Sequence, residues 1–354
     1  VSLSFALLLA CAPALAADGP IDPTLEARII AMGKVKSASA AQYSPDGKQI
    51  AYISTLSGSP QAWIIPAQGG EARQVTTGSD PVSGLRWSPH GKLAYAVSPG
   101  GGYNAQLFLS KPDGTQAIRI NEGEANTFPG DFAPDGRYYF RSNARSANST
   151  DTWLYDPATG KAKLAVEMES VGGIEDVLGH LAVVNRLVTR GNNNLWLEDL
   201  RTHRSMLLTP HRGTAQSSGL FGKDANTVYI AHNIDRDRMA LARVDISADG
   251  RSFKRTELVG RDDAELDDFL LNDAKDRALL VWNVAGRNEL ELLDLASNTR
   301  RRLPDAPNEL VGSVDFSPDG TRVVLALSGA TATSDLWQLD LASGEYTRLT
   351  VSPT

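Results

Sequence analysis

The fold is decided by the stretch Val314-Asp315-Phe316-Ser317-Pro318-Asp319-Gly320-Thr321-Arg322-Val323-Val324-Leu325-Ala326-Leu327. It places a Ser-Pro-Asp-Gly turn between an apolar alternating segment and a run of β-branched and aliphatic residues. Proline presets φ near −65° at the second turn position, aspartate tolerates the bridge region, and glycine takes the left-handed conformation that follows. These four residues predict a type I turn that closes a β-hairpin.

The same pattern recurs upstream at residues 43–52, 87–95 and 132–140. Ser44 and Ser88 lie 44 residues apart, and Ser44 and Ser317 lie 273 apart, which is six intervals of about 45. One four-stranded propeller blade has this length. Turns without the motif are therefore expected near residues 178, 222 and 272, and turn-like residues before apolar strands stand there, at 177–184, 220–230 and 271–281.

A second sequence feature repeats with the same period. About 20 residues after each hairpin turn comes an aromatic or aliphatic strand that ends in a polar turn. We predict an all-β fold, a seven-bladed β-propeller of four-stranded antiparallel blades, at residues 38–78, 82–123, 126–168, 170–212, 214–260, 262–308 and 310–354. Four tryptophans recur at one blade position and are interpreted as core residues between sheets: Trp63, Trp153, Trp196 and Trp337. Truncating one is expected to cost roughly 3–5 kcal/mol.

Residues 1–16 predict a secretory signal peptide. The apolar run at 3–10 is too short to span a membrane, and Ala14-Leu15-Ala16 has the small-x-small pattern of a cleavage site. No Lys or Arg precedes the run, so for a chain that begins at Val1 we expect a non-Met start or lost upstream residues. Cys11, the only cysteine, leaves lipidation open as an alternative. Export without a disulfide favours a bacterial periplasm.

Residues 17–37 are expected to hold one helix and a lead-in to the propeller at 38–354. Asp22 can cap the helix, Pro23 suits its first position and Gly33 ends it. We expect this helix to lie across the ring.

Several function classes are disfavoured. The net charge is −7 with scattered basic residues, which argues against nucleic acid, and no later stretch approaches 18 apolar residues, so no membrane span is expected. There is no Gly-x-Ser-x-Gly nucleophile motif and no phosphate-binding glycine loop. The histidines lack ligand spacing and are interpreted as solvated turn or loop residues, not metal ligands: His90, His180, His203, His211 and His232. We expect no cofactor and assign no catalytic residue.

Two acidic runs, at 122–124 and 262–268, lie on loops entering the third and sixth blades. Such loops can face a central channel and hold a peptide ammonium group, although solvated acids are the ordinary outcome. The glycine-rich segment 98–103 predicts a mobile hairpin tip without chemistry.

The stretches 44–52, 132–145, 207–211 and 335–350 together resemble the N-terminal propeller of secreted prolyl oligopeptidase family serine peptidases, of the acylaminoacyl-peptidase and dipeptidyl-peptidase type. The resemblance implies an α/β-hydrolase domain after the propeller. In that family the hydrolase carries the catalytic Ser, Asp and His, while the propeller restricts entry to short peptides and shapes the substrate pocket. No triad residue can be carried over to this sequence, and the glutamate pair of dipeptidyl peptidases has no secure match.

The preferred hypothesis is therefore the gating propeller of an exported serine peptidase that acts on short peptides, catalytically inert by itself and lacking its hydrolase. A stand-alone TolB-like periplasmic propeller that acts through protein contacts is the alternative. A propeller enzyme with an axial metal is a third possibility. The phase of the repeat further predicts that the first and last blades share no strand, so that side-chain packing alone closes the ring, which would be less stable without the hydrolase.

Overall fold

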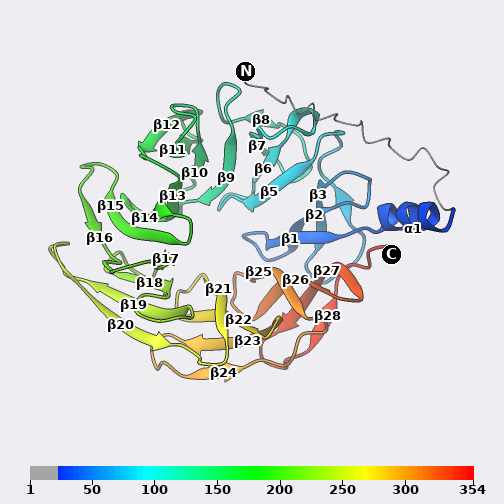
Figure 1. Cartoon of the computed structure of the whole chain (residues 1–354). Coiled ribbons are helices and arrows are strands. Elements are labelled where there is room, and N and C mark those ends of the chain that lie inside the picture. Colours follow the sequence, from blue (N-terminus) through cyan, green and yellow to red (C-terminus); the bar gives the residue numbers. More distant parts are fainter. Residues whose placement is uncertain (1–22) are drawn as a thin grey trace, which may run out of the picture. The chain divides into compact units, whose positions relative to one another are not determined.

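The described part of the chain, residues 23–354 of a computed structural model, contains one α-helix, one short 3-10 helix and 28 strands (Figure 1). The helix α1 (Pro23–Lys34) begins at the predicted proline and ends one residue after the predicted Gly33. The prediction that it lies across the ring stays a prediction. The signal peptide at 1–16 and Cys11 lie outside the described residues.

The 28 strands form seven four-stranded antiparallel sheets, each in chain order, so the predicted seven-bladed propeller is confirmed. The first four blades consist of β1 (Ala38–Tyr43), β2 (Gln49–Ser54), β3 (Gln61–Pro66) and β4 (Arg73–Gln74); β5 (Val82–Trp87), β6 (Leu93–Val97), β7 (Gln106–Ser110) and β8 (Ile118–Arg119); β9 (Thr127–Phe132), β10 (Tyr138–Ser142), β11 (Asp151–Asp156) and β12 (Lys161–Val166); β13 (Gly172–Leu178), β14 (Leu181–Thr189), β15 (Asn192–Asp199) and β16 (Ser205–Leu207). The last three consist of β17 (Ser217–Phe221), β18 (Thr227–His232), β19 (Ala240–Ile246) and β20 (Phe253–Val259); β21 (Glu265–Leu271), β22 (Arg277–Val284), β23 (Arg287–Asp294) and β24 (Arg300–Arg302); β25 (Leu310–Phe316), β26 (Arg322–Gly329), β27 (Ala332–Asp340) and β28 (Tyr346–Arg348).

The hairpin turns have the predicted geometry. In the last blade Gly320 has φ 65° and its N–H donates to the carbonyl of Ser317 at 2.7 Å, while the Ser317 hydroxyl donates to Asp319 at 2.6 Å. In the sixth blade, where the motif is absent, Lys275 takes the left-handed position with φ 53°. Its N–H donates to Asn272 O at 2.9 Å, so the turn survives the loss of glycine.

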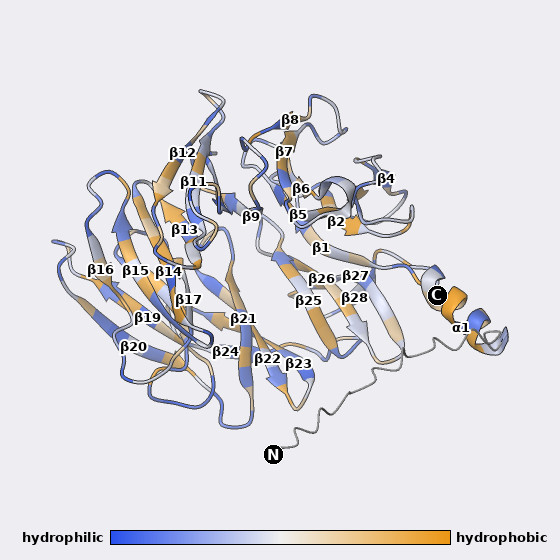
Figure 2. Ribbon diagram, turned by 45° about the horizontal axis from the view of Figure 1, so that its top comes forward, coloured by the Kyte–Doolittle hydropathy of each residue, from blue (hydrophilic) through white to orange (hydrophobic). Residues whose placement is uncertain are grey.

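The core consists of seven apolar clusters, one in each seam between adjacent blades. Apolar residues lie mainly on the strands of residues 36–353, and polar residues mainly on their connections (Figure 2). Each sheet is covered on both faces by its neighbours, which is why strands such as β22 read as continuous apolar runs.

The recurring tryptophans are less buried than predicted. Each packs against the edge of a cluster, but none is fully buried, and all four indole N–H groups lack a hydrogen-bond partner: Trp63, Trp153, Trp196 and Trp337. They lie on the third strand of their blades and pair with residues of the outermost strand. The fully buried tryptophan is Trp282, whose Nε1 donates to Glu291 at 3.0 Å.

The ring closes without a shared strand, as predicted, because β1 and β28 each pair only within their own sheets. The prediction that side-chain packing alone closes it is wrong. The Lys36 N–H donates to Pro353 O at 2.8 Å, the Tyr43 N–H donates to Asp315 Oδ2 at 2.8 Å, and Gln338 Nε2 donates to the Tyr43 hydroxyl at 2.7 Å. Backbone and side-chain hydrogen bonds therefore join the first and last blades.

Candidate functional site: the axial channel and its side pocket

One residue per blade recurs two places before each hairpin turn, on the innermost strand: Gln42, Arg86, Asp131, Asp176, Leu220, Leu270 and Asp315. Gln42, Asp131, Asp176, Leu220 and Asp315 line a cavity of about 560 Å³ together with turn residues such as Pro45, Pro89 and Pro318. All seven blades contribute to this lining. The cavity is therefore the axial channel of the propeller.

Several polar groups in the channel also connect neighbouring blades. Asp315 accepts from the Tyr43 N–H at 2.8 Å, Asp176 from the Phe221 N–H at 2.8 Å, and Gln42 from the Trp87 N–H at 2.6 Å. Each contact runs from one innermost strand to the next. These side chains therefore hold the ring together as well as setting the charge of its channel.

The channel is rich in carboxyl groups. Burial, together with the charges of Asp273 and Asp131, raises the pKa of Asp315 to about 7. Burial also raises the pKa of Asp176. The cation in the lining is Lys275, and the lining residue Asp131 pairs with Arg86, whose Nε lies 3.2 Å from Asp131 Oδ2. Near neutral pH the charge of the channel therefore changes with pH.

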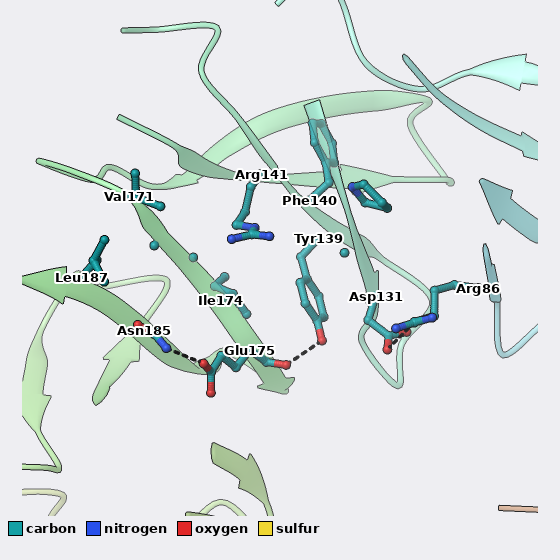
Figure 3. Close-up of a pocket in the computed structure, with 14 residues that line it drawn as sticks. Arg86, Asp131, Tyr139, Phe140, Arg141, Val171, Ile174, Glu175, Asn185 and Leu187 are labelled. Carbon is teal, nitrogen blue, oxygen red and sulfur yellow. Dashed lines mark hydrogen bonds and ion pairs between the residues drawn. The ribbon is translucent and has the colours of Figure 1, made fainter. Parts of the chain in front are cut away.

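A second cavity of about 400 Å³ opens between the third and fourth blades (Figure 3). It shares Asp131, Tyr139 and Glu175 with the lining of the axial cavity, so the two cavities are adjacent. We call it the side pocket. Its lining is Arg86, Pro129, Gly130, Asp131, Tyr139, Phe140, Arg141, Val171, Gly172, Gly173, Ile174, Glu175, Asn185 and Leu187.

Glu175 sits at a break in strand register, where β13 inserts one residue between Ile174 and Asp176 against β14. Its backbone carbonyl accepts from the Tyr139 hydroxyl at 3.0 Å, across the seam between blades 3 and 4. Its carboxylate accepts from Asn185 Nδ2 and from the Gly219 N–H, both at 2.6 Å. Burial nevertheless raises the pKa of Glu175 to about 7. The bulge thus places an ionisable group in the wall of the side pocket.

Arg141 projects from β10 into the side pocket (Figure 3). Its guanidinium carbon lies 5.4 Å from the centre of the Phe128 ring, a cation–π contact. Burial lowers the pKa of Arg141, partly opposed by the charge of Glu175.

The predicted candidates lie elsewhere. The acidic runs at 122–124 and 262–268 line neither cavity. The channel carboxyl groups come instead from the position two places before the hairpin turn, a signal visible in the sequence as acids recurring at 131, 176 and 315. The glycine-rich segment forms the short helix η1 (Pro99–Gly101), also outside both cavities.

The histidines are dispersed over the ring. His180 and His203 are turn residues beside Asp199 and Glu198 respectively. His211 contacts Thr209 O and Asn192 Oδ1, each at 2.8 Å. The interpretation as a solvated residue is wrong for His232, which is fully buried: its Nδ1 accepts from the Ile234 N–H and its Nε2 lies 3.0 Å from Glu257. Within residues 23–354 no group of three His, Cys, Asp or Glu side chains is arranged for a metal ion, and no helix is long and apolar enough to span a membrane.

Comparison with known proteins identifies a similar protein and a shared fold. No family model matches the chain. The chain is 26% identical to dipeptidyl aminopeptidase BIII of Pseudoxanthomonas mexicana over 98% of its own length, and it spans 52% of that relative. Among solved structures, a prolyl endopeptidase superposes with a TM-score of 0.72 at 15% identity, covering 92% of this chain and 51% of that one.

A second solved structure is a propeller alone. The β-propeller domain of the trilobed protease from Pyrococcus furiosus, described as having an open velcro topology, superposes with a TM-score of 0.68 at 14% identity. The match covers 91% of this chain and all of that domain. The chain thus matches the propeller portion of larger peptidases and spans about half the length of the curated relative.

Proposed function

We propose that this ring, a propeller of the prolyl oligopeptidase type, works as the substrate-gating domain of an exported serine peptidase that acts on short peptides. The observation that carries the proposal is the sequence match along 98% of the chain to about half of a dipeptidyl aminopeptidase. The other half of such an enzyme holds the catalytic domain in the family that the sequence resembles. We therefore place the nucleophile on an α/β-hydrolase partner domain and assign no catalytic residue to the ring.

The size of the channel supports a gating role. The axial cavity of about 560 Å³ lies in the range of sites that enclose small ligands. An extended short peptide fits such a space, and a folded domain does not. The hydrogen bonds between the innermost strands resist widening of the channel, since each would have to break.

A fluorophosphonate probe, which labels activated serines, tests whether the propeller lacks the catalytic nucleophile. We expect no labelling of the purified 354-residue chain, with a serine protease labelled in parallel as the control. Labelling of the chain would overturn the claim that it is inert. Export is tested by fractionating cells that express the gene, where a periplasmic product that has lost residues 1–16 is expected.

The gene provides the second test. Translation beyond the codon for Thr354 is expected to reveal a hydrolase domain with a Gly-x-Ser-x-Gly motif. The complete product should then cleave a short peptide and leave the same sequence intact inside a folded protein. A gene without any such domain would instead favour the TolB-like alternative, a periplasmic propeller that acts through protein contacts.

A further inference from the structure

The side pocket contains an arginine whose donors are unused. Two other partly buried arginines of the ring each pair with a carboxylate, Arg186 with Glu198 at 2.6 Å and Arg261 with Glu289 at 2.8 Å. The Arg141 side chain has no hydrogen bond and no ion pair to any described residue, and its one ring contact is with Phe128 at 5.4 Å. Guanidinium carries five N–H donors, and no Arg141 nitrogen is among the fully buried atoms without a partner, so these donors are accessible. They can therefore bind an acceptor that a ligand supplies.

The other charged groups of the side pocket are already paired. Both oxygens of Glu175 accept N–H donors, from Asn185 and from Gly219. Arg86 pairs with Asp131 across the seam between blades 2 and 3. The charged group of the side pocket that is left free to form hydrogen bonds is therefore the Arg141 guanidinium. It is a donor and carries a single positive charge.

The walls limit the size and charge of the ligand. Apolar side chains line much of the side pocket: Pro129, Phe140, Val171, Ile174 and Leu187. Space for the guanidinium depends on Gly173, since a Cβ there would stand 2.4 Å from Arg141 Cδ. One free guanidinium facing Glu175 and Asp131 suits a monoanion better than a dianion such as phosphate. The ligand group that matches this pocket is a planar carboxylate attached to a small apolar group.

We propose that the side pocket binds a carboxylate of a peptide in the channel, held by the guanidinium of Arg141. The choice of a peptide as the carrier rests on the proposed function. The carboxylate is either a free C-terminus or an Asp or Glu side chain, and the probes below separate these sources.

Calorimetric titration of the 354-residue chain tests the ligand class with three blocked peptides. Acetyl-Ala-Ala-Ala with a free C-terminus carries one carboxylate, its C-terminal amide carries none, and acetyl-Ala-Glu-Ala-amide carries one on a side chain. We expect at least one of the two acids to bind about tenfold more tightly than the amide. Equal affinity of acids and amide, no binding of any probe at millimolar concentration, or tighter binding of inorganic phosphate would each overturn the proposal.

Two variants and one control locate the site. Arg141→Gln should weaken acid binding about tenfold and leave the amide unchanged, and Gly173→Ala should do the same by displacing the guanidinium. Arg251→Gln, at an exposed arginine whose side chain has no ion pair in the described chain, is the matched control and should bind like the parent. Thermal unfolding confirms that each variant is folded. Unaltered binding by folded Arg141→Gln refutes the assignment, and because none of these titrations needs a hydrolase, that failure would leave the gating proposal standing.

Discussion

Two seams of the ring differ in a way that chain connectivity does not suggest. The seam between blades 7 and 1 has no continuous chain across it, yet a dense apolar cluster fills it and several hydrogen bonds cross it. The seam between blades 3 and 4 is crossed by the chain itself, yet it contains the side pocket of about 400 Å³. The non-covalent closure is thus the better packed of the two.

The difference has a local cause in the innermost strands. At the closing seam, β1 presents Ala38, Ala41 and Tyr43, all buried against the last blade. At the other seam, β13 begins with Gly172-Gly173 and then bulges at Glu175. Gly173 leaves room for the Arg141 side chain, and the bulge places Glu175 in the wall, so this seam carries polar groups around a cavity. We infer that the closing seam is built for stability and the seam between blades 3 and 4 for binding.

Truncating one isoleucine at each seam should give the largest difference in unfolding free energy between the two seams. Ile50→Ala removes a fully buried side chain at the closing seam and should lower the free energy of unfolding by about 3–4 kcal/mol. Ile174→Ala removes one that already borders the side pocket and should cost about 1–2 kcal/mol, because less packing is lost there. Urea denaturation measures both. Equal costs would mean that the two seams are packed equally well.

Matched tyrosine substitutions compare the hydrogen bonds across the same seams. Tyr43→Phe removes an acceptor of Gln338 in a buried hydrogen bond and should cost about 1–2 kcal/mol. Tyr139→Phe removes the donor to Glu175 O beside the side pocket, where water can replace it, and should cost about 0.5 kcal/mol. The same denaturation assay applies, with Tyr103→Phe, at a highly exposed tyrosine, as the control. A larger cost at Tyr139 would contradict the assignment of stability to the closing seam.

The sequence predicted the ring better than it predicted the site. Turn chemistry repeats with the blade, so Ser-Pro-Asp-Gly at 44–47 and 317–320 locates the hairpins directly, and even Lys275 keeps the turn without glycine. The side pocket has no such signature. It depends on a register break at Glu175 and on the absence of an ion pair at Arg141, which are facts about partners distant in sequence. The acids of the loops at 122–124 and 262–268 are visible in the sequence, but they lie outside both cavities, and whether they bind a peptide ammonium group stays a prediction.

The acids at the two seams give a test through pH. The pKa of Asp315, raised by burial to about 7 in the folded chain, means that the folded state holds a proton that the unfolded state has lost above about pH 4. This contribution to stability is present at low pH and is lost as the pH rises through about 7. Asp315→Asn, which keeps an acceptor for the Tyr43 N–H, should therefore make the chain about 1 kcal/mol more stable at pH 8 relative to pH 5 than the parent. Urea denaturation at both pH values measures the difference, and an identical change in both proteins would refute it.

The smallest expected effect is a change in ligand affinity with pH. It concerns the seam between blades 3 and 4. Below pH 7 Glu175 is largely protonated, and above it the ionised carboxylate repels a bound anion. The other ionisable groups of the two linings that contain Glu175 are Arg86, Asp131, Tyr139, Arg141, Asp176, Asp273, Lys275, Asp315 and Tyr43. Whichever blocked acid peptide binds to the side pocket should therefore bind a few-fold more tightly at pH 6 than at pH 8.

Glu175→Gln keeps acceptors and donors of similar shape and should remove most of that pH dependence, while Asp315→Asn, on the opposite seam, should retain it. Calorimetric titration at the two pH values measures both. If Glu175→Gln kept the full dependence, Glu175 would not control the charge of the side pocket. The bulge at that seam would then be a packing irregularity of blade 4, and the contrast between a seam for stability and a seam for binding would rest on Arg141 alone.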